Sequence, residues 1–235
     1  MITTRKLTDL KICADSRVLF VMPHPDDETV FVGGLLHHLS RMQIPTRVVT
    51  MCKGEKSTLR FGLHPSLDLG IARKIELSRA FGILGVTNFT IYDYPDSDLE
   101  HNENLIVSTI KKEIKKFRPT HVISLEPDGV YGHPDHIAVS QFTRQATVKP
   151  IQLLWATISP HYVLPSAKHM AKRKNIHPIA PDIKLRLATS DIVAKLKSFR
   201  AHASQFPLSL KKTPSDLLFF LANQILTNEF YAFGN

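Results

Sequence analysis

The stretch RVLFVMPHPDDE, residues 17–28, passes from an apolar run directly into a cluster of charge. A short, continuous apolar run such as 17–22 is typical of a strand that is buried on both faces of a sheet. A histidine and three carboxylates follow at once: His24, Asp26, Asp27 and Glu28. Because charged side chains are rarely buried without partners, these residues are expected beyond the carboxyl end of the strand, at the edge of the sheet.

Short β-rich runs alternate with helical patterns along the rest of the chain. Strands are expected at residues 17–22, 46–51, 88–92, 121–125, 152–158 and 184–188. Helices are expected at 29–42, 69–84, 104–117, from 135, from a cap at Ser190-Asp191 to about 204, and from Ser215 onward. Strands separated by crossover helices predict an α/β fold, a Rossmann-like, mostly parallel sheet with helices on both faces. No repeat or linker divides the sequence, so a single domain over residues 1–235 is expected.

Composition favours a globular protein with a sizeable core, since 43% of the residues are hydrophobic. No apolar run approaches the roughly 18–20 residues that span a bilayer, and residues 1–16 lack the apolar region of a secretory signal. The two cysteines, Cys13 and Cys52, form neither a disulfide framework nor a CxxC site. A cytoplasmic protein without a membrane span is therefore expected, and a homo-oligomer is left open.

The formal net charge of +9 raises the question of nucleic-acid binding. The basic residues fall mostly in helical stretches at 111–116 and 195–197 and in an irregular patch at 168–174. Solvated helix faces usually have this character, and no basic stripe interleaved with aromatic residues accompanies the charge. No nucleic-acid partner is expected, whereas an anionic substrate or surface stays open.

A second polar cluster, VYGHPDHIAV at residues 130–139, follows the strand expected at 121–125. His133 and His136 are three residues apart, so at the start of a helix they point to nearly the same side. Ligands of doubly wound sheets bind outside the carboxyl ends of the strands, so both clusters are expected to face one crevice. Imidazoles and carboxylates together suit Zn²⁺ with an open position for water, which supports hydrolysis.

Each cluster alone has a simpler interpretation. A single His-Pro-Asp is usually a turn with a capping aspartate, and the carboxylates of PHPDDE would be stabilised at a helix N-terminus by the helix dipole. Two such clusters at strand-to-helix junctions of one sheet favour the metal site instead.

The two motifs, PHPDDE and YGHPDH, resemble those of the LmbE/PIG-L family of zinc-dependent N-deacetylases, which act on molecules that contain N-acetylglucosamine. The similarity extends to Gly33-Gly34, to RKIELSRAFGILGV at 73–86, to YDYPDSDL at 92–99 and to AHASQF at 201–206. It therefore covers most of the chain in the order of the family.

The resemblance implies that His24, Asp27 and His136 bind the metal, Zn²⁺ or alternatively Fe²⁺. Asp26 would be the general base, and His133 would stabilise the oxyanion or protonate the departing amine. Tyr131 would help to polarise the amide carbonyl. Asp135 is expected to accept a hydrogen bond from an imidazole and so to orient it.

The resemblance also assigns Arg73 and Asp96 to substrate binding, through the sugar and its hydroxyls. An exposed Arg73 paired with a carboxylate is the competing interpretation. Glu28 is expected in the first turn of a helix, and His202 is as consistent with a buried, hydrogen-bonded histidine as with a site residue. Cys52 is expected to pack in the core.

One departure from the family concerns Val130, a β-branched residue where many members have glycine. It puts the conformation of this loop and the shape of the pocket in doubt, more than the chemistry.

The leading hypothesis is a metal-dependent hydrolase that removes an N-acetyl or other N-acyl group from an amino sugar or its conjugate, a small-molecule substrate. Hydrolysis of another amide, such as a thiol conjugate, is the alternative within the same chemistry. A metal phosphoesterase is a more distant alternative, because it would need carboxylates for a second ion. A non-catalytic binding protein is disfavoured by the intact Asp26.

Overall fold

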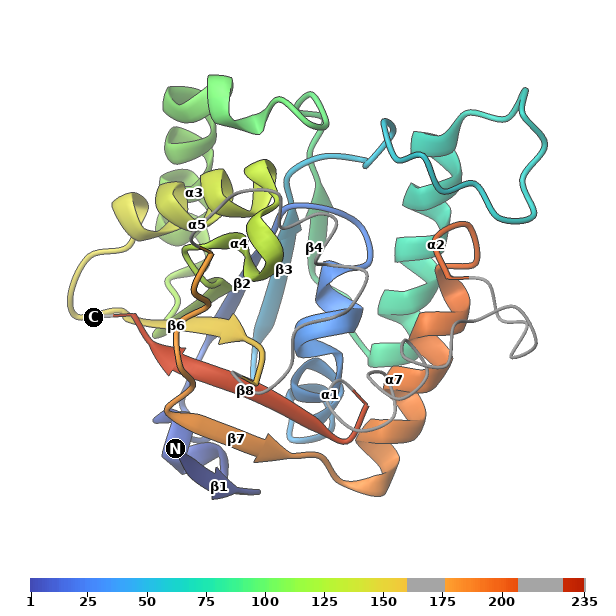
Figure 1. The fold of residues 1–235 in the computed structure, drawn as a ribbon. Coiled ribbons are helices and arrows are strands. Elements are labelled where there is room, and N and C mark those ends of the chain that lie inside the picture. Colours follow the sequence, from blue (N-terminus) through green and yellow to red (C-terminus); the bar gives the residue numbers. More distant parts are fainter. Residues whose placement is uncertain (160–175, 207–225, 235) are drawn as a thin grey trace.

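The computed structural model of the chain describes residues 1–159, 176–206 and 226–234 (Figure 1). Its strands are β1 (Ile2–Thr4), β2 (Val18–Met22), β3 (Thr46–Thr50), β4 (Phe89–Ile91), β5 (His121–Leu125), β6 (Gln152–Thr157), β7 (Ile183–Arg186) and β8 (Asn228–Phe233). Its α-helices are α1 (Asp27–Arg41), α2 (Leu69–Leu84), α3 (Glu103–Phe117), α4 (Gly129–Gly132), α5 (Pro134–Ala146) and α7 (Thr189–Ala201), and short 3₁₀ turns lie at Leu7–Leu10 and Leu99–Asn102.

Local signals set the ends of several helices. Asp68 begins α2 by accepting a hydrogen bond from the Ile71 N–H at 2.9 Å. Gly85 ends the same helix with a φ of 75°, a left-handed conformation that glycine adopts without steric cost. The expected helices at 29–42, 69–84 and 104–117 are therefore confirmed, with shifts of at most two residues at their ends.

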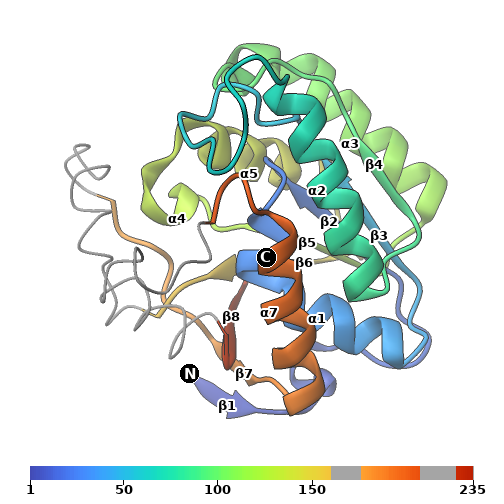
Figure 2. The same cartoon turned by 90° about the vertical axis from the view of Figure 1, so that its right-hand side faces the viewer.

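The strands form one sheet in the order β1-β7-β8-β6-β5-β2-β3-β4. Neighbouring strands pair in parallel except for β8, which lies antiparallel between β6 and β7. Helices α1, α2 and α7 cover one face, and α3 and α5 cover the other (Figures 1 and 2). The predicted Rossmann-like, mostly parallel sheet is confirmed.

The central strand β2 is buried on both faces, as its continuous apolar run predicted. Val18, Phe20 and Met22 belong to the core beneath α1, α2 and α7, whereas Leu19 and Val21 belong to the core beneath α3 and α5. The alternation of side chains along a strand therefore supplies both hydrophobic cores from one segment.

The order of the strands reverses at β2. The chain leaves β2 through α1 to β3 on one side, and it later returns through α3 to β5 on the other side. A crevice forms where such connections diverge, at the carboxyl ends of β2 and β5. PHPDDE follows β2 and EPDGVYGHPDH follows β5, so the topology brings both motifs to this point.

Some expectations differ from the structure. Strands β1 and β8 were not predicted, and the antiparallel β8 makes the sheet mixed. The expected cap at Ser190-Asp191 is wrong: α7 begins at Thr189 after Ala188, and the Asp191 carboxylate binds His37 and His38 instead. The helix expected from Ser215 lies outside the described residues.

None of the described helices combines the length and the apolar character needed to cross a bilayer.

Candidate metal centre and active site

The loop after β2 delivers three functional side chains within four residues. Helix α1 begins at Asp27, so the side chains of Asp26 and Asp27 project at its N-terminus, where the helix dipole stabilises negative charge. The Asp27 carboxylate accepts the backbone N–H of His24 at 3.0 Å. This contact folds the loop back on itself and places the imidazole beside the carboxylate.

The loop after β5 is held by Glu126, a fully buried carboxylate that sequence reasoning did not single out. Glu126 accepts hydrogen bonds from the N–H groups of Asp128 and Val130 in its own loop. It also accepts the N–H of Ile179, at 3.2 Å, from the segment before β7. One side chain therefore ties two loops together below the second motif.

Val130 adopts φ 65° and ψ −55°, a strained conformation that is rare for a β-branched residue. Such strain costs about 1–3 kcal/mol and persists only when the surroundings determine the conformation. Here the Val130 side chain is buried in the core and Glu126 holds its N–H. Val130, at a position where many family members have glycine, is therefore held in one backbone conformation. The ring centroid of the next residue, Tyr131, lies 5.2 Å from that of His136.

The three predicted metal ligands converge. His24 Nδ1 lies 3.3 Å from His136 Nε2 and 3.3 Å from Asp27 Oδ2, and His136 Nε2 lies 3.4 Å from Asp27 Oδ1. Zinc bonds of about 2.0–2.1 Å in tetrahedral geometry separate ligand atoms by about 3.3 Å. The spacing and the chemistry of these donors therefore fit a divalent cation with a position left for solvent or substrate.

The second nitrogen of His24 faces two buried carboxylates. Its Nε2 lies 3.0 Å from Asp135 Oδ2 and 3.3 Å from Asp96 Oδ1. An N–H at Nε2 leaves the lone pair on Nδ1 free to bind a cation, which is the usual arrangement of a metal-binding histidine. The expected contact of Asp135 with an imidazole is thus present.

Asp96 does not reach toward solvent, although it was expected to bind sugar hydroxyls. Its side chain is buried, and its second oxygen accepts the Lys56 N–H at 2.6 Å. Both oxygens are therefore engaged with protein groups, and the assignment of Asp96 to the substrate stays an untested prediction. The geometry instead places Asp96 behind His24.

Arg73 is buried, so the interpretation as an exposed arginine is wrong. Its guanidinium donates to the carbonyls of Gly54 and Pro25 and lies 3.2 Å from Asp26 Oδ2. Arg73 therefore braces the loop that carries Asp26. A contact of Arg73 with substrate stays an untested prediction.

Electrostatics at the site separate the roles of its groups. Burial lowers the pKa of His136 to about 3, so its ring is neutral and can bind a cation. Burial also raises the pKa of Asp26 to about 6, with Arg73 opposing this shift and Asp27 adding to it. A carboxylate with such a pKa can exchange protons near neutral pH.

His133 begins helix α5, where its Nδ1 accepts the N–H of Asp135 at 3.2 Å. Burial lowers the pKa of His133. A neutral ring whose Nδ1 accepts must carry its proton on Nε2, so His133 presents an N–H donor beside the ligands. Its ring centroid lies 4.9 Å from that of His24.

Tyr131 is a second neutral donor. Burial, with the nearby charge of Asp27, raises the pKa of Tyr131, so the phenol keeps its proton. Its ring lies edge-on to His133 and His136.

Glu28 and His202 contact each other, which answers two questions that the sequence left open. Glu28 lies in the first turn of α1 as expected, is fully buried, and its Oε1 lies 2.8 Å from His202 Nε2. His202 is therefore a buried, hydrogen-bonded histidine at the end of α7. The sequence could not predict this pairing, because 174 residues separate Glu28 and His202.

One further acid group, Glu76, was not predicted to matter. Glu76, one turn after Arg73 on α2, accepts the N–H and the hydroxyl of Ser204 at 2.9 and 2.7 Å. The spacing of Arg73 and Glu76 within the RKIE motif was the available signal, since residues three apart share one helix face.

Cys52 is fully buried in the core beneath α3 and α5, as expected. Its thiol donates to the Pro23 carbonyl at 3.4 Å. Cys52, Asp96 and His24 also lie close enough for a cation, as do His24, His133 and His136. A cation held by Cys52, Asp96 and His24 would use His24 Nε2, the nitrogen that faces Asp135. Such binding would replace the hydrogen bond between Asp135 and His24 that orients the imidazole.

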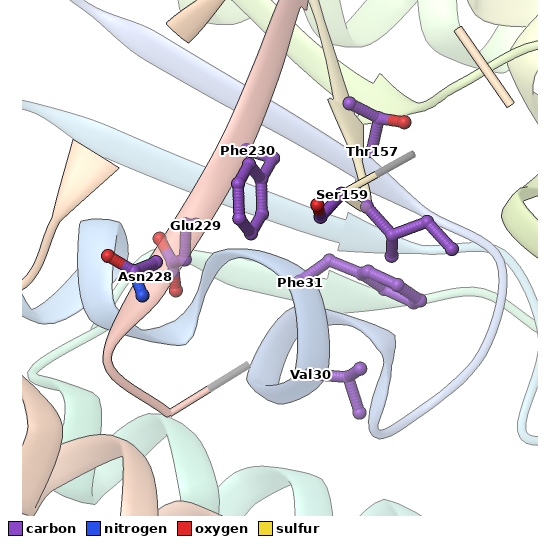
Figure 3. Close-up of a pocket in the computed structure, with 8 residues that line it drawn as sticks. Val30, Phe31, Thr157, Ser159, Asn228, Glu229 and Phe230 are labelled. Carbon is purple, nitrogen blue, oxygen red and sulfur yellow. The ribbon is translucent and has the colours of Figure 1, made fainter. Parts of the chain in front are cut away.

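A small pocket elsewhere in the protein does not carry this chemistry. It is lined by residues of α1, of the end of β6 and of β8, among them Phe31, Ser159 and Phe230 (Figure 3). The described residues that line it include no histidine, and the one carboxylate among them, Glu229, pairs with Lys195 at 2.5 Å. The candidate active site is the cluster at the carboxyl ends of β2 and β5.

The family model of GlcNAc-PI de-N-acetylases, PIG-L, matches residues 19–147, which is more than half of the chain and contains both motifs. The chain belongs to the PIG-L family.

Its relatives in the family include deacetylases of sugar conjugates. The chain is 31% identical over 198 residues to the probable N-acetyl-alpha-D-glucosaminyl L-malate deacetylase 2 of Bacillus anthracis, with 82% of each chain covered. It is 27% identical over 234 residues to the 1D-myo-inositol 2-acetamido-2-deoxy-alpha-D-glucopyranoside deacetylase of Mycobacterium sp. (strain KMS), covering 82% of this chain and 75% of that one.

The fold matches the N,N'-diacetylchitobiose deacetylase of Pyrococcus horikoshii, with a TM-score of 0.66 and 21% identity over 93% of this chain and 83% of that one. At this identity the likeness concerns the fold.

Proposed function

We propose that this chain is a metal-dependent N-deacetylase that hydrolyses the acetamide of a small conjugate containing N-acetylglucosamine, releasing acetate and a free amine. The observation that carries the proposal is the convergence of His24, Asp27 and His136 to mutual distances of 3.3–3.4 Å beside Asp26. Membership of the PIG-L family, with its deacetylase relatives, supports the choice of bond and of sugar.

Zinc, held by His24, Asp27 and His136, would supply Lewis-acid activation of water and of the acetamide carbonyl. We infer zinc because imidazole and carboxylate donors at this spacing suit it, and because three protein ligands leave a position open. Fe²⁺ is the alternative ion that the same donors accommodate.

The chain's own groups divide the proton chemistry. Asp26, whose carboxylate lies 3.2 Å from the Arg73 guanidinium, takes the proton of the attacking water. His133 Nε2–H and the Tyr131 hydroxyl donate hydrogen bonds to the carbonyl oxygen as it gains negative charge. The proton on Asp26 is then available to the nitrogen of the departing amine, which completes the exchange of an amide and water for an acid and an amine.

An amine-release assay across N-acetylglucosamine conjugated to inositol, malate, a lipid inositol and a second sugar, with N-acyl thiol conjugates included, tests the proposal. Activity should require metal: removal by a chelator should abolish it, and one equivalent of Zn²⁺ per chain should restore it. Undiminished turnover by metal-free protein would refute the mechanism. Metal analysis of protein purified without added metal distinguishes zinc from iron.

The variant Asp26→Asn isolates the base from the ligands. Asparagine keeps the size of the side chain and an oxygen for Arg73, but it cannot accept the proton. Turnover should fall by about 10²–10⁴-fold, while bound metal stays near one equivalent. Loss of metal together with activity would instead make Asp26 a ligand.

A further inference from the structure

Asp26 has an unusual backbone conformation for a residue that transfers protons. Its φ is 113° and its ψ is −30°, in a region that residues other than glycine rarely adopt. A conformation of this kind is energetically unfavourable and requires contacts that hold it in place. The contacts of its N–H and of its carboxylate therefore decide where Asp26 points.

The N–H of Asp26 is held by Glu28, whose Oε2 accepts it at 2.9 Å. The carboxylate of Asp26 is held from another side by Arg73 at 3.2 Å. Neither contact involves the side chain of a predicted metal ligand, and both hold Asp26 directly.

Glu28 is in turn fixed by groups that lie away from the metal site. Its Oε1 accepts the hydroxyl of Thr29 at 2.7 Å and lies 2.8 Å from Nε2 of His202. Within the described residues, the buried Nδ1 of His202 has no hydrogen-bond partner. With its hydrogen on Nε2, the ring donates to Glu28 and leaves no buried N–H unsatisfied at Nδ1. A buried carboxylate without such donors would be strongly destabilised, and His202 therefore holds Glu28 in place.

The segment after α7 also supports the second contact of Asp26. Ser204 donates both its N–H and its hydroxyl to Glu76, which lies one turn after Arg73 on α2. Helix α7 packs against α1 and α2 (Figures 1 and 2). The AHASQF segment at 201–206 therefore contacts α1 through Glu28 and α2 through Glu76. These two helices carry Glu28 and Arg73, the residues that hold Asp26.

We propose that Glu28 and His202 are positioning residues that fix the backbone of Asp26. The AHASQF segment at 201–206 thereby sets the orientation of the Asp26 carboxylate, which accepts the proton. This inference rests on the proposed function in one respect, that Asp26 is the general base. It assigns no contact with metal or substrate to either residue.

The test compares His202→Leu with His202→Gln. Leucine removes the donor, whereas the amide nitrogen of glutamine can reach the position of Nε2 and donate to Glu28. His202→Leu should lower kcat by about 10–100-fold, because a displacement of about 1 Å at a reacting group has effects of this size. KM and the bound metal should change less than about twofold, and His202→Gln should recover most of kcat.

A double-mutant cycle separates positioning from a general loss of structure. In the Asp26→Asn background, His202→Leu should reduce the residual rate less than about twofold, because the group that it positions is gone. Asp191→Asn is the matched control: it removes a buried carboxylate that holds His37 and His38 at the opposite end of α7. It should lower stability and leave kcat per folded molecule unchanged.

Hydrogen exchange of the Asp26 amide gives a readout that does not depend on turnover. Exchange should be faster in His202→Leu than in the parent protein and should return toward the parent rate in His202→Gln. If the parent releases no amine from any substrate but exchange changes as described, the proposed function fails and the positioning role stands.

Unchanged exchange and unchanged kcat in His202→Leu would overturn the positioning role, as would an equal fold-loss in the Asp26→Asn background. If His202→Leu does not fold, Thr29→Val replaces it, since it removes the other side-chain donor to Glu28 with little change of shape. Thr29→Val should lower kcat in the same direction by a smaller factor, and a parent-like rate there would equally overturn the proposal.

Discussion

Asp135 offers the sharpest test of the metal centre because its carboxylate serves three donors with two oxygens. Oδ2 lies 3.0 Å from His24 Nε2 and accepts the Ser97 N–H at 2.8 Å, and Oδ1 accepts the Leu99 N–H at 3.2 Å. Asparagine has one carbonyl oxygen and an NH₂ group. In Asp135→Asn, the NH₂ group must therefore face at least one of the three N–H groups, which is a contact between two donors. The side chain also loses its negative charge, so it holds the ring of His24 less firmly in its orientation.

The size of the effect follows from the second carboxylate at the same nitrogen. Loss of an outer hydrogen-bond partner of a metal-binding histidine weakens binding by about 10–100-fold, or about 1.4–2.7 kcal/mol. Asp96 Oδ1 lies 3.3 Å from His24 Nε2 and can take over part of the contact. Asp135→Asn should therefore weaken zinc binding by about tenfold, Asp96→Asn by less, and the double variant by more than the product of the two.

Competition with a chromophoric chelator at fixed pH measures these affinities, and thermal unfolding of the metal-free proteins checks that each variant folds. Asp191→Asn provides the control, since it alters a histidine–carboxylate contact remote from the metal and should bind zinc like the parent. Parent-like affinity in the double variant would refute the view that the two carboxylates orient His24.

Two further predictions concern catalysis and stability. In His133→Asn, the side-chain oxygen can still cap α5, but the Nε2–H donor is removed. The kcat should therefore fall by about 10²–10³-fold, with metal content little changed. A parent-like rate measured on metal-replete protein would exclude His133 from the reaction. Glu113→Gln should lower the free energy of unfolding at pH 7 by about 3 kcal/mol, because it breaks the buried ion pair with Arg47. Burial raises the pKa of Glu113, but hydrogen bonds from Arg47 and Tyr92 outweigh this and hold it below its ordinary 4.5. The stabilisation is therefore complete above pH 4.5 and lost as the pH falls through the lowered pKa, so denaturant titrations should show the parent and the variant converging between pH 5 and strongly acidic pH; a constant difference would contradict this assignment.

The sequence predicted the fold where local signals were strong. Strand β2 is a continuous apolar run, α2 has a capping aspartate and a terminal glycine, and both agree with the structure. Strand β8 has no comparable signal, because its place between β6 and β7 depends on pairing with two distant segments. The cap of α7 was misplaced because Asp191, a residue type that favours caps, instead binds two histidines of α1.

The sequence by itself determined which residues could meet: two His-Pro-Asp motifs, each at the carboxyl end of a buried strand, which parallel packing must bring to one edge of the sheet. The tertiary structure alone decided how the neighbouring charges are used. Asp96 and Asp135 share one nitrogen of His24, Arg73 turns inward to Asp26, and His202 binds Glu28 across 174 residues. The physical reason is that spacing along the chain governs contacts within a loop or a helix face, whereas a buried charge must find its partner wherever the packing of the whole chain places one.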